Sequence, residues 1–268
     1  MRLPGQARQG TLAGMTLHHT VSGTGPPVVL LHAGVADGRM WAAQTSTGPG
    51  GLADRFTLVV PDLRGFGRSP MPAPGDAPWS NAGDVLTLLD QLGLDAASVV
   101  GSSYGGRIAL EMASLAPERV DRLVLVCAAL GGLEPTASVE AFGDEEEALL
   151  EAEDIDAATD LNVRTWLGPD ADDAARELVR EMQRHAFVVQ LAADEVDPED
   201  VTVDLARVTM PTTVFYGAKD LDFFGDVARH LHKHLPQSDL VELPWAGHLP
   251  TLERPDEMAG RLVTALTN

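Results

Sequence analysis

Residues 97–105 read Ala97-Ser98-Val99-Val100-Gly101-Ser102-Ser103-Tyr104-Gly105. The first residues form an apolar run typical of a buried strand, and residues 107–113 carry the apolar stripe of an amphipathic helix. The stretch therefore predicts a strand that turns tightly into a helix at Ser103. A serine in such a turn has a strained backbone, which is tolerated when glycines stand two residues before and after it. Its hydroxyl then projects beside a helix N-terminus, which favours developing negative charge.

A nucleophilic serine needs a base and a carboxylate that orients the base, and both follow later apolar runs. Residues 211–216 predict a buried strand and Asp220 comes soon after it, while residues 239–243 predict another strand that precedes His248. We expect Ser103, Asp220 and His248 to form a catalytic triad, in that chain order. Asp222 is the alternative acid. The Gly-x-x-Asp spacing favours Asp220, because it lets the turn close before the acid.

Four segments in sequence order resemble motifs of the α/β-hydrolase fold family, and the resemblance covers most of the chain. They are the glycine-flanked serine, residues 28–34 with their His-Ala-Gly turn, the Asp-x-Arg-Gly-x-Gly-x-Ser segment at 61–69, and residues 246–255 around His248. The resemblance implies an α/β fold with a mostly parallel eight-stranded sheet, helices on both faces and a helical cap insertion.

By the same resemblance, the oxyanion hole consists of backbone N–H groups. The implied donors are the amides of Gly34 and Tyr104, with Val35 as the next candidate. Each such donor contributes about 10²- to 10³-fold in rate. Ala33 departs from the glycine that is usual at its position in the family. His32 ends an apolar run before a turn, and we interpret it as a structural hydrogen-bonding residue rather than a second base.

The pattern along the chain predicts the domain organisation. A length of 268 residues suits one catalytic domain with an insertion. The expected strands are 28–32, 57–61, 98–101, 123–127, 212–216 and 239–243, with helical patterns in all five intervals, including 82–92, 104–115 and 224–235. Alternation around Gly14 predicts an antiparallel hairpin over 11–23.

The longest interval predicts a lid over the strand ends, where ligands bind in open α/β sheets. We divide the chain into a core of residues 1–130 and 207–268 and a helical cap of residues 131–206. Helices are expected over 145–153, 156–166, 170–190 and, as a fourth, 198–206.

Seven residues are candidates for substrate contact, and ordinary packing between cap and core is the alternative for each. From the cap they are Trp166, Met182, His185 and Phe187, and near the oxyanion loop they are Val35, Met40 and Trp41. We do not expect His185 to be catalytic.

The charge of the chain limits its partners. The formal net charge is −21, and residues 134–204 hold 22 acidic residues against four arginines. Nucleic acid and anionic membranes are unsuitable partners for such a segment. We interpret it as a solvated helical face, with a docking site for a cationic partner as the alternative. No leader pattern or membrane-spanning run appears, so we expect a cytoplasmic protein. The single cysteine, Cys127, is interpreted as a buried thiol. The sequence leaves the number of subunits open.

No cofactor or metal is expected. His230 and His234 share a helix face while His232 points away, so only two ligands converge. Gly65-Phe66-Gly67 lacks the third glycine of a dinucleotide fingerprint.

The predicted function is hydrolysis of a small-molecule ester or lactone through an acyl-enzyme. By resemblance, carbon–carbon bond hydrolysis, enol-lactone hydrolysis and perhydrolysis use similar scaffolds and remain alternatives, whereas a serine at position 103 disfavours an aspartate-nucleophile mechanism. A small-molecule receptor that keeps the triad is a further alternative from a different functional class.

Overall fold

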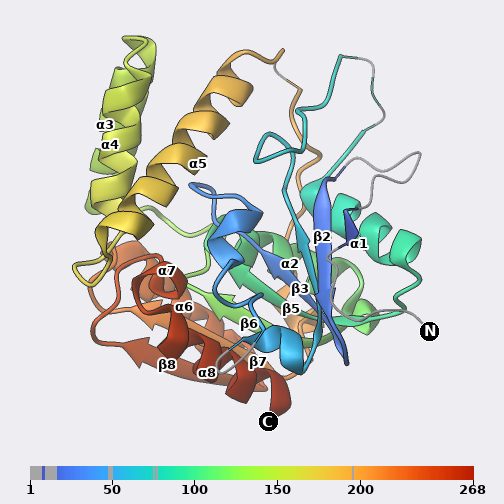
Figure 1. Ribbon diagram of the computed structural model, residues 1–268. Helices are drawn as coiled ribbons and strands as arrows, with labels where there is room; N and C mark the ends of the chain where they lie inside the picture. Colours follow the sequence, from blue (N-terminus) through green and yellow to red (C-terminus); the bar gives the residue numbers. More distant parts are fainter. Residues whose placement is uncertain (1–7, 10–16, 48–50, 75, 77, 195) are drawn as a thin grey trace.

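The computed structural model describes residues 8–9, 17–47, 51–74, 76, 78–194 and 196–268 (Figure 1). An eight-stranded sheet forms its centre, in the order β1-β2-β4-β3-β5-β6-β7-β8. The strands are β1 Arg8–Gln9, β2 His19–Gly23, β3 Pro27–Leu31, β4 Thr57–Pro61, β5 Ala97–Ser102, β6 Val120–Val126, β7 Thr212–Gly217 and β8 Ser238–Leu243. β1, β2 and β4 pair antiparallel, and every pair from β4 to β8 is parallel. The predicted mostly parallel sheet is confirmed.

The central strands bury both faces, as their runs of valine and leucine require. In β3, Val29 and Leu31 pack beneath α1, α2 and α6, whereas Val28 and Leu30 face the layer that contains α8. The helices of these layers are α1 Asn81–Leu92, α2 Tyr104–Leu115, α6 Asp222–His234 and α8 Pro255–Thr267, with the short α7 Pro250–Glu253 before α8 and the 3₁₀ turn η3 Pro117–Arg119 after α2. Helices therefore cover both faces, and the sheet edge carrying the strands' carboxyl ends is left to hold a site.

The interval between β3 and β4 differs from the prediction. It contains no α-helix among its described residues, only the 3₁₀ turns η1 Gly38–Trp41 and η2 Leu52–Asp54. The segment contains five glycines and one proline, which disfavour a regular helix. Asp37 instead caps η1 by accepting a hydrogen bond from the Arg39 amide. In the hairpin predicted over 11–23, residues 11–16 around Gly14 lie outside the described residues, whereas β2 falls within 17–23 and pairs antiparallel with β1.

The long insertion between β6 and β7 holds three helices, α3 Ala137–Glu151, α4 Ile155–Trp166 and α5 Asp173–Leu191. They gather at one end of the molecule (Figure 1, yellow-green to gold), where α4 packs against α5 and α3 contacts α6. The prediction of a fourth helix over 198–206 is wrong. That segment is extended up to the 3₁₀ turn η4 Leu205–Arg207, and its backbone is tied to the core by Glu199 N to Trp79 O at 2.7 Å. The boundaries proposed for core and cap stay a prediction.

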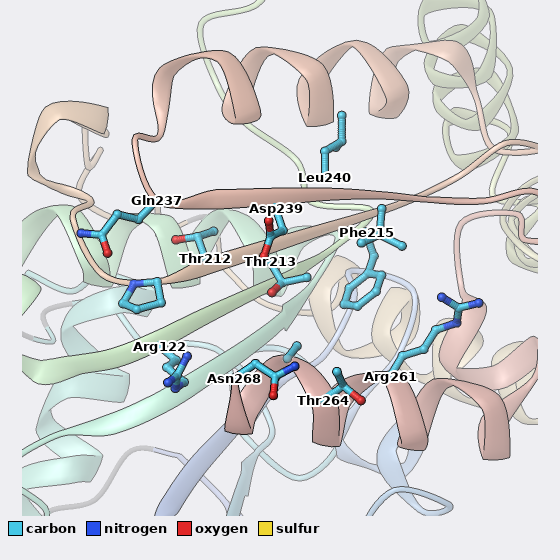
Figure 2. Close-up of a pocket in the computed structure, with 13 residues that line it drawn as sticks. Arg122, Thr212, Thr213, Phe215, Gln237, Asp239, Leu240, Arg261, Thr264 and Asn268 are labelled. Carbon is cyan, nitrogen blue, oxygen red and sulfur yellow. The ribbon is translucent and has the colours of Figure 1, made fainter.

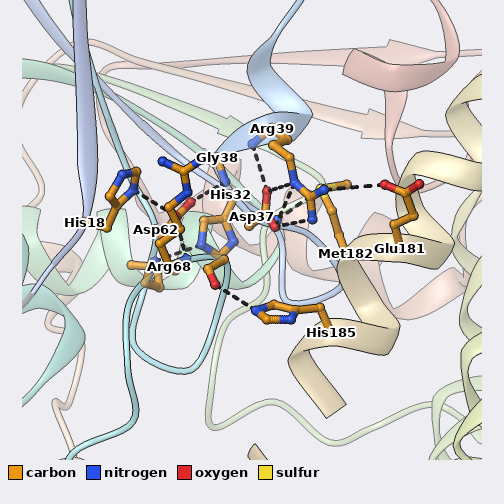
Figure 3. Close-up of polar contacts among 12 residues, drawn as sticks. His18, His32, Asp37, Gly38, Arg39, Asp62, Arg68, Glu181, Met182 and His185 are labelled. Carbon is orange, nitrogen blue, oxygen red and sulfur yellow. Dashed lines mark hydrogen bonds and ion pairs between the residues drawn. The ribbon is translucent and has the colours of Figure 1, made fainter. Parts of the chain in front are cut away.

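Helix α5 is attached to the core by polar contacts with two loops (Figure 3). His185 Nε2 lies 2.8 Å from the carbonyl oxygen of Gly67, and Glu181 forms an ion pair with Arg39 at 3.5 Å. The Asp37 amide donates to the sulfur of Met182. These contacts set the rotation of α5 about its axis. No helix in the described part of the chain is long and apolar enough to cross a membrane.

Candidate active site

Ser103 occupies the tight turn between β5 and α2. Its backbone has φ 52° and ψ −113°, a conformation that non-glycine residues rarely adopt. The end of β6 holds this turn in place, because Ser103 N donates to Val126 O at 2.9 Å and Ala129 N donates to Ser103 O at 3.0 Å. Hydrogen bonds at both the N–H and the carbonyl oxygen of Ser103 therefore keep its backbone in the strained conformation.

The flanking glycines permit the close approach of the helix to the sheet. A Cβ atom at Gly105 would lie 2.5 Å from Leu31 O and 2.6 Å from His32 O, closer than real contacts allow. A Cβ atom at Gly101 would collide with the carbonyl of Gly105. Both positions need glycine for steric reasons, and the loop after β3 is thereby brought next to the start of α2.

Three side chains that are distant in sequence meet at this turn. His248 Nε2 lies 2.7 Å from Ser103 Oγ, and His248 Nδ1 lies 2.7 Å from Asp220 Oδ2. When neutral imidazole donates Nδ1–H to the carboxylate, Nε2 is left to accept the serine O–H. The arrangement therefore poises a base against a hydroxyl on a strained turn.

The structure separates the two candidate acids. Asp220 follows β7 and reaches His248, and its Oδ1 accepts the Leu221 N–H at 2.7 Å. Asp222 begins α6 and instead accepts hydrogen bonds from Thr136 and Ser138 at 2.6 and 2.5 Å. These hydroxyls lower the pKa of the Asp222 carboxyl, which is exposed. Asp222 thus connects α6 to the insertion and makes no hydrogen bond with the imidazole.

Aromatic packing and backbone contacts hold the imidazole of His248. Its ring centroid lies 4.1 Å from that of Phe224 and 4.6 Å from that of Trp166, and its amide donates to Trp166 O at 3.1 Å. The preceding residue, Gly247, donates its N–H to the carboxylate of Glu253. Burial raises the pKa of the Glu253 carboxyl, and N–H donors partly offset that effect. The histidine loop is therefore held from both the insertion and α7.

The expected oxyanion donors lie beside Ser103. A Cβ atom at Gly34 would contact Tyr104 Cβ at 3.5 Å, which places the loop after β3 against the first residue of α2. The N–H of Tyr104 stands at the helix start, where backbone donors lack intrahelical partners. Gly34 and Val35 line the same cavity as Ser103. Both backbone segments therefore lie beside Ser103, and their role as oxyanion donors stays a prediction.

His32 has a structural environment. Its Nδ1–H donates to Ala33 O at 2.8 Å, and its Nε2 accepts the Leu63 N–H at 2.9 Å. Burial lowers the pKa of its imidazole, so the neutral form is favoured. The adjacent Ala33 is buried, and its N–H points to Met40 Sδ. Both nitrogens of His32 are occupied by backbone groups, which supports the structural interpretation.

A cavity of about 270 Å³ lies between the Ser103 turn and the insertion. Its lining residues are Gly34, Val35, Ser103, Phe142, Glu146, Asn162, Trp166, Gln183, Phe187, Gln190, Phe224 and His248. A wider hollow of about 640 Å³ shares Gly34 and Gln190 with it, and Arg64, Met71 and Trp79 also line that hollow. The inner cavity is small for a ligand site.

Comparison with known proteins identifies the family of the chain. Residues 26–153 match the model of the alpha/beta hydrolase fold family. RutD of Caulobacter sp. (strain K31), which bears the name of a carbamate hydrolase, is 30% identical over 97% of this chain and 98% of its own. The chain belongs to the α/β-hydrolase fold family. It is a hydrolase of that fold.

Two further similarities extend over nearly the whole α/β-hydrolase chain. The pimeloyl-[acyl-carrier protein] methyl ester esterase of Nitrosomonas europaea is 27% identical over 90% of this chain and 96% of its own. The crystal structure of a hydrolase from Pseudomonas aeruginosa PA01 superposes with a TM-score of 0.78 at 28% identity, covering 98% of this chain and 99% of that one.

Four of the predicted substrate-contact residues lie outside the lining of this cavity. Met40 and Trp41 are 1% and 0% exposed and belong to the core cluster that includes β3 and α8. Met182 points to Asp37, and His185 bonds Gly67 on the flank shown in Figure 3. Met40, Trp41 and Met182 therefore pack in the interior, and His185 forms a polar contact away from the cavity. Val35, Trp166 and Phe187, the other three candidates, do line the cavity.

Six lining residues were missed by the sequence analysis: Phe142, Glu146, Asn162, Gln183, Gln190 and Phe224. One sequence signal was available. Gln183, Phe187 and Gln190 share one face of α5 at helical spacing, so two amides interrupt an otherwise apolar stripe. A polar residue in the buried stripe of a helix indicates a buried polar contact.

A separate hollow of about 580 Å³ lies at the opposite end of the sheet (Figure 2). Thr212 and Asp239 line it at the beginnings of β7 and β8, together with Asn268 at the end of α8. Because the central strands are parallel, this hollow lies at their amino ends, away from Ser103. It is therefore no part of the site around the triad.

Among the described residues, one group brings three metal-ligand types together. Atoms of Cys127, Asp220 and His248 lie within 4.8 Å of one another. Burial, together with the charge of Asp220, raises the pKa of the Cys127 thiol well above its ordinary value, so the thiol keeps its proton. Asp220 and His248 bond each other. The donor set therefore fits a hydrogen-bonded acid and base, and a protonated thiol is a poor metal ligand.

The three histidines near the end of α6 do not converge on one point. The ring centroids of His230 and His234 lie 4.2 Å apart, while His232 Nδ1 forms a hydrogen bond with Ser238 Oγ.

Proposed function

We propose that this α/β-hydrolase is a serine hydrolase that cleaves a carboxylic ester or lactone of a small molecule through an acyl-enzyme. The proposal depends on one observation, the continuous hydrogen-bonded chain from Ser103 through His248 to Asp220. The esterase of Nitrosomonas europaea, similar over most of its length, supports ester chemistry.

In the proposed first step, His248 Nε2 accepts the proton of Ser103 as Oγ bonds to the substrate carbonyl carbon. Asp220 stabilises the resulting imidazolium and holds its orientation. The carbonyl oxygen becomes negative and accepts hydrogen bonds from the Gly34 and Tyr104 amides. Collapse of this intermediate breaks the carbon–oxygen bond, and His248 gives its proton to the departing alkoxide. In a lactone the departing oxygen stays attached to the acyl chain.

In the second step, His248 removes a proton from water as the water oxygen attacks the acyl carbon. The bond to Ser103 Oγ breaks, the serine recovers its proton from the imidazolium, and the carboxylic acid leaves. Aromatic side chains of the insertion surround the serine and limit access of bulk water. The small cavity favours short acyl groups.

Adjacent serines offer a matched test. We expect Ser103→Ala to lower kcat/KM for p-nitrophenyl butyrate by about 10⁴- to 10⁶-fold. Ser102→Ala, in the preceding buried strand position, retains activity within a few fold because Ser102 is 0% exposed and lies outside the cavity lining. A fluorophosphonate probe should add its mass to Ser103 in wild type and in Ser102→Ala. Full activity in Ser103→Ala would overturn the proposal.

Turnover distinguishes the enzyme from the receptor alternative. We expect steady release of many equivalents of p-nitrophenol per protein molecule. A single burst equal to the protein concentration, with no further release, would favour a receptor that is acylated once.

A further inference from the structure

The three helices of the insertion contribute four polar side chains to the cavity wall. Glu146 comes from α3, Asn162 from α4, and Gln183 and Gln190 from α5. Most other side chains on this wall are aromatic: Phe142, Trp166, Phe187 and Phe224. A polar group among aromatic rings is costly to desolvate unless it has a hydrogen-bond partner. The partners of these four side chains therefore indicate what each one does.

Asn162 is fully engaged within the protein. Its Nδ2 donates to Glu146 Oε1 at 2.5 Å and to Ala158 O at 2.9 Å, and its Oδ1 accepts the Trp166 indole N–H at 2.8 Å. Asn162 thus links α3 to the tryptophan that packs on His248. Its hydrogen bonds give it a structural role, because both N–H donors are used and Oδ1 already accepts the indole N–H.

Gln183 differs in having a free carboxamide. The residue is 4% exposed and lines the cavity, and its Oε1 is buried without a hydrogen-bond partner. Within the described ranges, no hydrogen bond involves either end of this amide. Gln190, two turns further along the same face of α5, is engaged through Nε2 with Gly65 O at 3.3 Å. Of the two cavity glutamines, Gln190 has one amide N–H engaged by the protein, whereas the Gln183 carboxamide has no hydrogen-bond partner among the described residues.

We propose that Gln183 is a substrate-binding residue, and that the substrate is a short ester or lactone carrying a neutral amide-type group close to the scissile carbonyl. This inference rests on the proposed function. An amide presents one N–H and one carbonyl oxygen, which match the acceptor and donor of the Gln183 carboxamide. Rotation of the terminal amide about its last side-chain bond is soft, so both ends can turn toward the cavity.

The charge around the cavity argues for a neutral group. Glu146 lies on the same wall, and its Oε1 accepts a hydrogen bond from Asn162 Nδ2. The insertion carries a large excess of acidic residues. A carboxylate on the substrate would be repelled here, whereas an amide is not. A cavity of about 270 Å³ further limits the substrate to a short chain.

Three isosteric p-nitrophenyl esters test the inference: those of N-acetylglycine, 4-oxopentanoic acid and 4-methylpentanoic acid. They place an amide, a ketone and an alkyl group at the same position. Because intrinsic reactivity differs among the esters, the readout is the amide-to-alkyl ratio of kcat/KM in Gln183→Met relative to wild type. We expect this ratio to fall about tenfold, and the ketone-to-alkyl ratio to fall less, since a ketone uses only the donor of Gln183.

Gln190→Met is the matched comparison, because it makes the same substitution on the same helix face at an amide that is engaged with Gly65 O. Its amide-to-alkyl ratio should fall less than that of Gln183→Met. Gln183→Glu provides a second variant that keeps the acceptor but loses the N–H donor, and its amide-to-alkyl ratio should also fall. Thermal melting and fluorophosphonate labelling establish that each variant is folded.

The outcomes separate the two proposals. Equal amide-to-alkyl ratios in wild type and both Gln183 variants, with the alkyl ester still hydrolysed, overturn the assignment of Gln183 and leave the hydrolase intact. Failure of the probe to label Ser103, with no ester hydrolysed, overturns the proposed function itself.

Discussion

His248 Nδ1 lies 2.7 Å from Asp220 Oδ2, and the two side chains are 2% and 1% exposed. Burial of both partners means that water does not compete for this hydrogen bond. A buried carboxylate that accepts Nδ1–H fixes which nitrogen of the ring faces Ser103. The contact therefore couples the orientation of the base to a single acid.

Replacing the acid tests this coupling. We expect Asp220→Asn to lower kcat for p-nitrophenyl butyrate by about 10³- to 10⁴-fold, because the amide can leave the imidazole in the wrong tautomer. Asp222→Asn is the control, and it should change kcat less than about threefold, since Asp222 bonds Thr136 and Ser138 instead. Equal losses in the two variants would contradict the assignment of the acid.

Glycine at position 105 should be required for stability. In Gly105→Ala the new methyl group meets the carbonyl oxygens of Leu31 and His32, so we expect a loss of about 1–3 kcal/mol in the free energy of unfolding. Gly260→Ala in α8 is the control, because nothing lies within 4 Å of its added Cβ atom. That variant should gain up to about 1 kcal/mol from helix propensity. Urea denaturation measures both, and a stable Gly105→Ala would refute the steric explanation.

Because the Glu253 carboxyl is buried, we expect the free energy of unfolding of the protein to depend on pH. Burial raises the pKa of its carboxyl, so the folded protein binds the proton more tightly than the unfolded chain. Its contribution to the free energy of unfolding is therefore fully present below the ordinary glutamate pKa and is lost as pH rises through the raised value.

Glu253→Gln removes this titration. We expect the free energy of unfolding of the variant, relative to wild type, to increase by on the order of 1 kcal/mol between about pH 4 and about pH 8. Urea denaturation across that range measures the difference. Parallel pH profiles for the two proteins would show that the carboxyl does not titrate in the folded state with a raised pKa.

The acidic insertion should discriminate against anionic esters. We expect mono-p-nitrophenyl glutarate to have a lower kcat/KM than p-nitrophenyl pentanoate, with the gap narrowing several-fold between about 0.02 M and about 0.5 M salt as charges are screened. The neutral ester serves as the control for general salt effects. A gap that does not respond to salt would assign the discrimination to cavity shape instead.

Local chemistry made much of this site predictable. The turn at Ser103 depends on residues within a few positions of one another, and steric requirements at Gly101 and Gly105 leave a direct signature in the sequence. The strands were predictable because a sheet covered on both faces needs unbroken apolar runs. The local structure of short glycine-rich segments was not predictable. The interval after β3 forms 3₁₀ turns where a helix was expected.

The cavity lining depended on helix rotation. Met182 and Gln183 are neighbours on α5, and successive residues on a helix point about 100° apart. Met182 was a predicted contact residue and Gln183 was not. In the structure Met182 faces Asp37 and Gln183 lines the cavity, because packing of the buried face of α5, together with its contacts with the core loops, sets the rotation of the helix.

The sequence by itself therefore determined the fold class, the strained serine turn and the order of the candidate triad, since each follows from short-range sterics and burial patterns. Only the tertiary structure decided that Asp220 rather than Asp222 contacts the imidazole and that Gln183 lines the cavity with a free amide. Those outcomes depend on how elements far apart in the chain pack against one another, and a side chain's direction from a helix changes with small rotations that local sequence does not specify.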